Sequence, residues 1–323
     1  MAGTAPGRRA GAGGVDRRLG VTAAAGFGAA GVACGLKPSG GPDLALVVGD
    51  PGTLAAGVFT TNQVVAAPVV WSRERLAASA DARVVVLNSG NANACTGPAG
   101  EAAVRATVER AAAELGCRAE QVLVCSTGVI GVPLETGRVA DGVAKAAAAL
   151  DRSGGLAAAE AILTTDTVVK QAGVRVAGGA TVGGMAKGAA MLAPDLQPAT
   201  HATMLAVLTT DAVADPDVLG DVLAQATSAT FNRITVDGAQ STNDTVLLLA
   251  SGASGARPDP AGLAAAVRAV CGDLAGQMLA DAEGGTKVVS VQVGGAGPVE
   301  EALAVARRVA DSPLVKTAVY GGD

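Results

Sequence analysis

The sequence has 323 residues, enough for one large domain or two ordinary domains, and half of them are hydrophobic. The formal net charge at pH 7 is −5 and aromatic residues make up only 2% of the chain, which argues against a nucleic-acid-binding protein. Charged residues account for 16%, a fraction too low for a disordered chain.

Residues 1–19 are rich in glycine, alanine and arginine, and they lack the continuous apolar run of a signal peptide. We predict a flexible N-terminal tail here. No later apolar run reaches the length of a membrane span, so no membrane contact is expected. The odd number of cysteines, without a Cys-x-x-Cys pair, indicates buried free thiols in a reducing cytoplasm. The cysteines are Cys34, Cys95, Cys117, Cys125 and Cys271.

Gly26, Gly28 and Gly31 match the glycine fingerprint of dinucleotide-binding proteins. The match requires a preceding strand, and residues 21–25 form a poor one. Chance matches are also expected in a chain with 45 glycines. We therefore predict no nucleotide cofactor.

Predicted strands and helices alternate along the chain. The predicted strands are 43–48, 83–87, 121–125, 174–176, 245–250 and 288–293, with a strand-like segment at 314–320. The predicted helices are 101–115, 139–150, 260–282 and 299–310. Gly116 is expected to end the first of these helices, and Asp259 or Pro260 to begin the third. This order favours a layered α/β fold without internal repeats or independent domains.

The chain has a single histidine, His201. A zinc site or a Ser-His-Asp triad would need this residue, and no partner motif accompanies it, so we predict neither. Thr203 suggests a different chemistry. A threonine whose amine is freed by cleavage of the preceding bond carries nucleophile and base in one residue. The alternative is structural, because a β-branched threonine in an apolar run also suits a buried strand.

Residues 183–212, GGMAKGAAMLAPDLQPATHATMLAVLTTDA, closely resemble the self-cleavage segment of the ornithine acetyltransferase family, the bifunctional glutamate N-acetyltransferases and amino-acid acetyltransferases of arginine biosynthesis. Six other segments agree with the family in the same order, which is far more specific than one short motif. They are GVFTTN at 57–62, LNSGNANA at 87–94, CSTGVIG at 125–131, AILTTDT at 161–167, STNDT at 241–245 and EGGTK at 283–287. The resemblance spans roughly residues 20 to 323.

The resemblance implies a layered α/β fold shared with self-processing, N-terminal-nucleophile aminopeptidases. It also implies that the chain cuts itself between Ala202 and Thr203, into fragments 20–202 and 203–323. The Thr203 hydroxyl would attack the Ala202 carbonyl, water would resolve the ester, and the freed amine would serve as base. Acetyl from N2-acetyl-L-ornithine would then move to Thr203 and on to L-glutamate. No cofactor is implied, although acetyl-CoA is a possible co-substrate, and the cleaved fragments would assemble as α2β2.

By the same resemblance, Thr127 and Gly128 form the oxyanion hole, a hydroxyl and a backbone N–H at a strand end. Taken without the resemblance, they suit an ordinary turn. Thr164, Lys187, Thr203 and Glu283 are expected to contact the amino-acid substrate. A lysine suits a carboxylate and a glutamate suits an ammonium group, although both are more often solvated loop residues.

Asn243 and Asp244 are expected to be turn or network residues rather than catalysts. The chain also departs from the family in three places. Residues 197–201 interrupt the usual run into Ala-Thr-Met-Leu and make Thr200 a competing nucleophile. Ala190 replaces a usual glycine and would be strained at positive φ. The family sequences continue beyond Asp323, where further substrate contacts are expected. These departures leave a non-catalytic truncated remnant as one alternative. A hydrolytic relative on the same scaffold, an N-terminal-threonine amidase or aminopeptidase, is the other.

Overall fold

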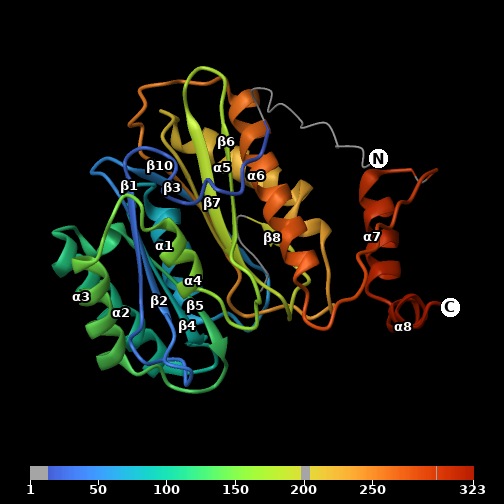
Figure 1. The fold of residues 1–323 in the computed structure, drawn as a ribbon, viewed down its shortest axis with the longest axis horizontal. Helices are drawn as coiled ribbons and strands as arrows, with labels where there is room; N and C mark the ends of the chain where they lie inside the picture. The colour runs from blue at the N-terminus through green and yellow to red at the C-terminus, as the bar shows by residue number, and fades with distance from the viewer. Residues whose placement is uncertain (1–13, 198–203, 296) are drawn as a thin grey trace, which may run out of the picture.

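Two β-sheets stack face to face in the computed structural model, which describes residues 14–197, 204–295 and 297–323 (Figure 1). The six-stranded sheet contains, in spatial order, β6 (Lys170–Arg175), β7 (Thr181–Lys187), β9 (Leu205–Thr210), β10 (Thr245–Ala250), β3 (Leu54–Thr60) and β8 (Leu196–Gln197). The four-stranded sheet contains β1 (Phe27–Val32), β2 (Leu44–Gly49), β4 (Val84–Asn91) and β5 (Val122–Val129). The layered α/β prediction is confirmed.

Helices cover the outer faces of both sheets and the edges of the space between them, and the last two helices of the chain stand apart from the sheets and contact each other (Figure 1). In chain order they are α1 (Ala67–Ala78), α2 (Gly97–Leu115), α3 (Thr136–Ala148), α4 (Gly155–Ala161), α5 (Pro216–Ala229), α6 (Pro260–Ala280), α7 (Val299–Ala310) and α8 (Pro313–Gly321), with two 3₁₀ turns at Ala119–Gln121 and Phe231–Arg233. α5 and α6 pack on the six-stranded sheet, whereas α2 and α3 pack on the four-stranded sheet.

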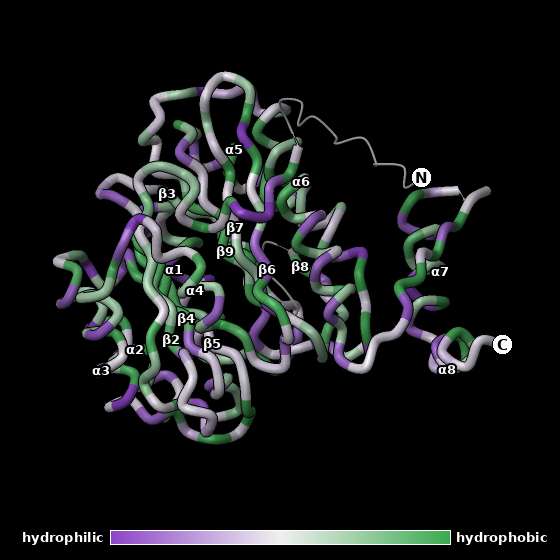
Figure 2. The backbone as a smooth tube through the Cα atoms, viewed as in Figure 1, coloured by the Kyte–Doolittle hydropathy of each residue, from purple (hydrophilic) through white to green (hydrophobic). Residues whose placement is uncertain are grey.

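The core consists of three apolar layers. One lies between the sheets and contains Phe27 and Leu87 of one sheet with Met185 and Leu247 of the other. The other two lie under the outer helices. Figure 2 shows the hydrophobic residues concentrated in the strands at the centre of the molecule. Burial on both faces explains why β2, β9 and β10 show no alternation of polar and apolar residues.

Most of the predicted elements are confirmed, with boundaries that differ by a few residues. α2 ends as expected, because Gly116 takes the left-handed conformation at φ 58°. α6 begins with Asp259, whose carboxylate accepts a hydrogen bond from the Gly262 N–H at 2.7 Å. The glycine fingerprint of residues 26–31 lies largely within β1, paired with β2, rather than in a loop before a helix.

Two strand predictions at the C-terminal end are wrong. Residues 288–293 alternate in polarity, but they pair with no other strand in the part of the chain described, and Val288 is 63% exposed. Residues 314–320 belong to α8. Local signals override β-propensity there: Ser312 caps the Val315 N–H, Pro313 takes the first helical position, and Gly322 ends the helix at φ 78°.

By length and composition alone, α6 is apolar and long enough to cross a membrane, contrary to the expectation from the sequence. In the structure it is a core helix. Val267, Val270 and Leu274 are fully buried against the six-stranded sheet. Such burial explains the apolar composition without a membrane.

Part of the expected N-terminal tail is held against the fold. Asp16 forms a backbone bridge with Gly173 of β6, and the Arg17 guanidinium donates to both oxygens of Asp273 at 2.9 Å. Residues 1–13 lie outside the described residues.

All five cysteines are free thiols, as predicted, but not all are buried. Cys125 and Cys271 are buried, Cys34 and Cys117 are partly buried, and Cys95 is exposed. The expectation of uniformly buried thiols is therefore wrong.

Candidate active site

A contact between Lys187 and Thr127 joins the two sheets. Lys187 is the last residue of β7 and Thr127 lies in β5. The Lys187 ammonium donates to the Thr127 hydroxyl at 3.3 Å, with both residues at least 95% buried. Two residues predicted to belong to the same active site, 60 positions apart in the chain, therefore meet inside the protein.

The environment of Lys187 favours loss of its proton. Burial lowers the pKa of this ammonium, and the charges of Lys170 and Lys37 lower it further. The carboxylates of Asp166 and Asp244 oppose the shift without reversing it. Lys187 is thus a buried cation whose charge depends on its neighbours.

Asp166 organises the Lys187 environment, a role that no pattern in the sequence indicated. One carboxylate oxygen accepts from the Gly188 N–H and the Lys170 ammonium, each at 2.7 Å. The other accepts from the Thr164 N–H at 3.1 Å and lies 3.8 Å from the Lys187 ammonium. Although burial alone would raise the pKa of Asp166, Lys187 and Lys170 outweigh it and lower that pKa. Asp166 thereby links Thr164 to Lys187.

Thr127 and Gly128 lie at an irregular place in the pairing of β4 with β5. Asn91 pairs with both Thr127 and Val129, so the ladder is offset at Gly128. Gly128 has φ 133°, and a Cβ there would lie 2.3 Å from the Gly90 carbonyl carbon. The strand predicted for 121–125 therefore continues through this pair, and only glycine fits at Gly128.

Asn243 ties this irregular region to the six-stranded sheet. Its amide nitrogen donates to the carbonyls of Ala92 at 2.6 Å and Ser126 at 2.9 Å, and its oxygen accepts from the Thr242 hydroxyl at 2.5 Å. Its predicted network role agrees with these contacts. Asp244 is fully buried and interacts electrostatically with Lys187, a closer connection to the site than expected.

Replacing Asn243 with alanine is expected to lower the free energy of unfolding by about 1–3 kcal/mol for each buried carbonyl left without a donor. Urea denaturation would measure the loss. Asn243→Asp keeps the size of the side chain but removes the amide donor, so it should also unfold at a lower urea concentration than the wild type. If Asn243→Asp unfolds at the wild-type urea concentration, the hydrogen bonds to the Ala92 and Ser126 carbonyls do not stabilise the protein.

Glu283 approaches the same region through its backbone. Its N–H donates to the Ala189 carbonyl at 2.8 Å, two residues beyond Lys187, while its side chain is exposed. The neighbouring Ala190 does not take positive φ; Met191 does, at 51°. The strain expected at Ala190 is therefore absent.

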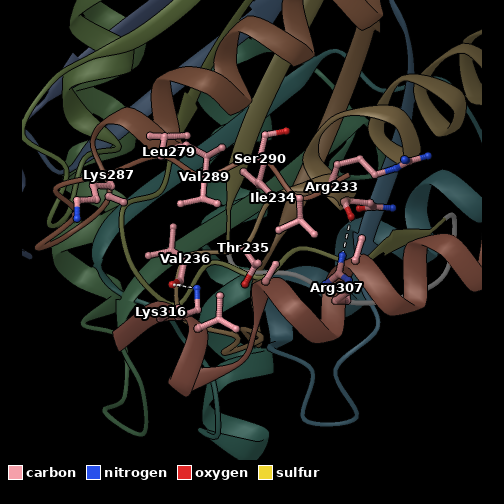
Figure 3. A pocket seen from close by; sticks show the side chains of 18 of the residues that line it. Arg233, Ile234, Thr235, Val236, Leu279, Lys287, Val289, Ser290, Arg307 and Lys316 are labelled. Atoms are coloured by element: carbon pink, nitrogen blue, oxygen red, sulfur yellow. Dashed lines mark hydrogen bonds between the residues drawn. The ribbon is translucent and has the colours of Figure 1, made fainter. Parts of the chain in front are cut away.

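A cavity of about 1200 Å³ lies between the C-terminal helices and the rest of the fold (Figure 3). Its wall includes Ile234, Val236, Leu279 and Val289. The Lys316 ammonium, also in the wall, donates to the Val236 carbonyl at 2.8 Å, as Figure 3 shows. Glu283 lines this cavity, but Thr127, Thr164 and Lys187 do not. The cavity is therefore distinct from the place where most of the predicted site residues meet.

The predicted nucleophile and its scissile bond lie outside the described residues, as do Thr200 and His201. Met204, the first described residue after them, is fully buried and accepts a hydrogen bond at its carbonyl from the Thr245 N–H at 2.8 Å. The next residue, Leu205, lies directly opposite Lys187 in the antiparallel pairing of β7 with β9. The strand that follows Thr203 thus begins beside Lys187.

The sequence profile of the ArgJ family matches residues 28–323. The curated Arginine biosynthesis bifunctional protein ArgJ of Mycolicibacterium paratuberculosis is 54% identical over 317 residues, covering 95% of this chain and 76% of that protein. The protein of the same name from Thermobifida fusca is 52% identical over 306 residues, covering 94% of this chain and 78% of that protein.

Solved structures agree with these relatives. Ornithine acetyltransferase from Mycobacterium tuberculosis, crystallised with ornithine, is 51% identical, with a TM-score of 0.56 over 57% of this chain and 100% of its own. Arginine biosynthesis bifunctional protein argJ from Bacillus halodurans is 35% identical, with a TM-score of 0.52 over 57% of this chain and 99% of its own. A Burkholderia sp. beta-aminopeptidase, 15% identical with a TM-score of 0.52, covers 85% of this chain and 90% of its own and shares the fold alone.

Proposed function

The chain belongs to the ArgJ family, and on that premise we propose that it transfers acetyl from N2-acetyl-L-ornithine to L-glutamate through an acetyl-threonine enzyme. It is an N-acyltransferase of arginine biosynthesis. The observation that carries the proposal is the buried contact of Lys187 with Thr127. Lys187 ends β7 and pairs with Leu205, two residues after the proposed nucleophile Thr203.

The proposed reaction has two acyl transfers. The Thr203 hydroxyl attacks the acetyl carbonyl, its proton passes through the Thr203 amine to the departing nitrogen, and ornithine leaves as the amine. The amine of glutamate then attacks the ester, forms the amide and returns the hydroxyl to Thr203. Thr127 and Gly128 are proposed to donate hydrogen bonds to the oxyanion in both steps, since developing charge is best stabilised by fixed donors.

Self-cleavage between Ala202 and Thr203 is part of the proposal. The solved ornithine acetyltransferase chain is matched over its whole length and yet covers only 57% of this chain. Residues 20–202 are 183 of the 323 residues, which is the same share. The solved chain thus has the length expected of an N-terminal fragment, which supports cleavage of this chain between Ala202 and Thr203.

Lys187 is proposed to bind the substrate carboxylate, Thr164 to line the same pocket and Glu283 to bind the substrate ammonium. A buried ammonium provides a strong, charge-assisted hydrogen bond to a carboxylate, which offsets part of the cost of burying both groups. Because the pKa of Lys187 is lowered by burial, the strength of this contact depends on pH.

We expect kcat/KM for N2-acetyl-L-ornithine to fall as pH rises through the pKa of Lys187, at a midpoint below the usual 10.5. The protonated form binds the carboxylate below this midpoint, and the neutral form does not bind it above. Lys187→Met should lower kcat/KM about tenfold to a hundredfold and abolish this fall at high pH, the high-pH limb of the profile. Initial rates from pH 6 to 10 would measure both; an unchanged limb in Lys187→Met would show that another group titrates.

The function itself is tested with purified wild-type protein, N2-acetyl-L-ornithine and labelled glutamate. Labelled N-acetylglutamate is the expected product. Release of free acetate without transfer would favour the amidase or aminopeptidase reading, and neither product would favour the non-catalytic remnant. Replacing the donor with acetyl-CoA tests whether it serves as a co-substrate.

We also propose that the enzyme acts in the cytoplasm, with small molecules as its partners, and that the cleaved fragments assemble as α2β2. The biosynthetic role of the family supports the cytoplasmic location, and the ornithine complex of the M. tuberculosis relative supports small-molecule partners. Light scattering on the purified protein would give the mass of the assembly.

A further inference from the structure

Lys170 is a fully buried lysine held between two carboxylates. Its ammonium lies 2.7 Å from a carboxylate oxygen of Asp166 and 2.5 Å from one of Asp281, whose side chains are 0% and 6% exposed. It also donates to the Val168 carbonyl at 3.3 Å. Isolated buried charges are very costly, so this trio, here called the Lys170 cluster (Asp166, Lys170 and Asp281), persists only because its members are paired.

The Lys170 cluster joins three segments that are distant in the sequence. Asp166 lies in the loop after α4, Lys170 begins β6, and Asp281 caps the C-terminal end of α6. Asp281 also accepts from the N–H groups of Thr167 at 3.0 Å and Val168 at 3.4 Å. The end of α6 is thereby fixed to the loop.

Each joined segment leads to a residue of the proposed substrate site. Asp166 binds the backbone N–H of Thr164 and of Gly188, the residue after Lys187. Asp281 precedes Glu283 by two positions, and the Glu283 N–H returns to the Ala189 carbonyl. Three of the four predicted substrate contacts, Thr164, Lys187 and Glu283, therefore lie on segments joined by one buried ionic group.

We propose that Lys170 and Asp281 are positioning residues of the substrate site, which hold Asp166 against Lys187 and fix the segments that carry Thr164, Lys187 and Glu283. This inference rests on the proposed function, because that function gives these three residues their roles. Neither Lys170 nor Asp281 needs to touch the substrate.

The charges of the Lys170 cluster act on Lys187 in opposite directions. The charged groups that face Lys187 are Asp166, Asp244, Lys170 and Lys37. Removing the Lys170 charge takes away a repelling cation, so Lys187 should hold its proton to higher pH. Removing the Asp281 charge leaves Lys170 less neutralised, so Lys187 should lose its proton at lower pH.

The test follows the titration of Lys187 by NMR in the full chain labelled with ¹³C at the ε-carbon of its six lysines. Lys187→Met assigns the signal. We expect Lys170→Met to raise the midpoint by about one pH unit and Asp281→Asn to lower it by a similar amount. The double variant restores the charge balance and should return the midpoint close to that of the wild type. The high-pH limb of kcat/KM for N2-acetyl-L-ornithine should move with the midpoint in each variant.

Two matched controls accompany these variants. Lys145→Met removes an exposed lysine of α3, and Asp273→Asn removes another carboxylate of α6, one that pairs with Arg17. Neither should shift the midpoint. If Lys170→Met does not fold, Asp281→Asn alone decides, since asparagine keeps an oxygen for the Thr167 and Val168 N–H groups.

Midpoints that stay at the wild-type value, or that move in the same direction in both variants, would overturn the proposal. The wild-type protein could transfer no acetyl while the Lys187 midpoints of Lys170→Met and Asp281→Asn still shift in opposite directions. In that case the proposed function is wrong, but the effect of the Lys170 cluster on Lys187 is established.

Discussion

Replacing Thr203 with alanine is expected to leave the chain uncut and to lower acetyl transfer by at least about 10⁴-fold. Both effects have one cause, because the hydroxyl that would attack the Ala202 carbonyl is the same hydroxyl that would carry the acetyl group. Loss of the nucleophile in a covalent mechanism leaves only the catalysis supplied by binding and by the oxyanion donors. The loss should therefore appear in kcat.

Intact-mass spectrometry of the purified protein would measure the first effect, with Thr200→Ala as the matched control. The wild type and Thr200→Ala should each give two fragments that divide between Ala202 and Thr203. A cut before Thr200 would move the nucleophile into the segment 197–201. A single uncut mass for the wild type would contradict the covalent mechanism and favour a non-catalytic remnant.

Replacing Gly128 with alanine is expected to lower kcat about 10²- to 10³-fold and the free energy of unfolding by about 2–4 kcal/mol. The added Cβ would lie 2.3 Å from the Gly90 carbonyl carbon and 2.5 Å from the Asn91 nitrogen, both rigid backbone atoms. β4 and β5 must separate to admit it. The Thr127 hydroxyl would then move from its position beside Lys187, and the Gly128 N–H would move with it.

Two glycine controls separate the causes of that loss. Gly131→Ala meets nothing within 4 Å but keeps an unfavourable φ of 83°, so it shows the cost of backbone strain alone. Gly137→Ala, in the first turn of α3, has neither constraint and should be neutral or slightly stabilising. Thermal unfolding and initial rates would be measured on all three variants. If Gly128→Ala keeps the wild-type kcat, Thr127 and Gly128 do not form the oxyanion hole.

The sequence predicted those parts of the fold that local patterns determine. The apolar runs of β2 and β10 and the stop at Gly116 follow from burial and backbone conformation, and the structure has them at those places. The helix 314–320 was missed because its apolar residues suit a strand, whereas Ser312 and Pro313 before it determine a helix start. Segment 288–293 alternates like a strand but pairs with no strand in the described part of the chain, because an alternating pattern alone does not provide a partner.

The site was predictable in its individual residues but not in its connections. Family resemblance pointed to Thr127 and Lys187, and the structure places them in contact. Nothing local to Lys170 or Asp281 indicates that they belong to one buried ionic group beside Lys187. They are 111 positions apart and meet only because α6 packs along β6. A buried ion pair between distant segments is a property of the tertiary fold.

The strand order of the six-stranded sheet determines what a cut before β9 would do to the molecule. β9 and β10 would belong to the new C-terminal piece, yet they lie between β7 on one side and β3 on the other, both from the N-terminal piece. The two pieces would be interleaved within a single hydrogen-bonded sheet, so neither could leave without exposing two open sheet edges. Once unfolded, however, they would be separate molecules that must find each other again. Cleavage would thus make refolding dependent on concentration, and the mature protein would rely on slow unfolding for its persistence.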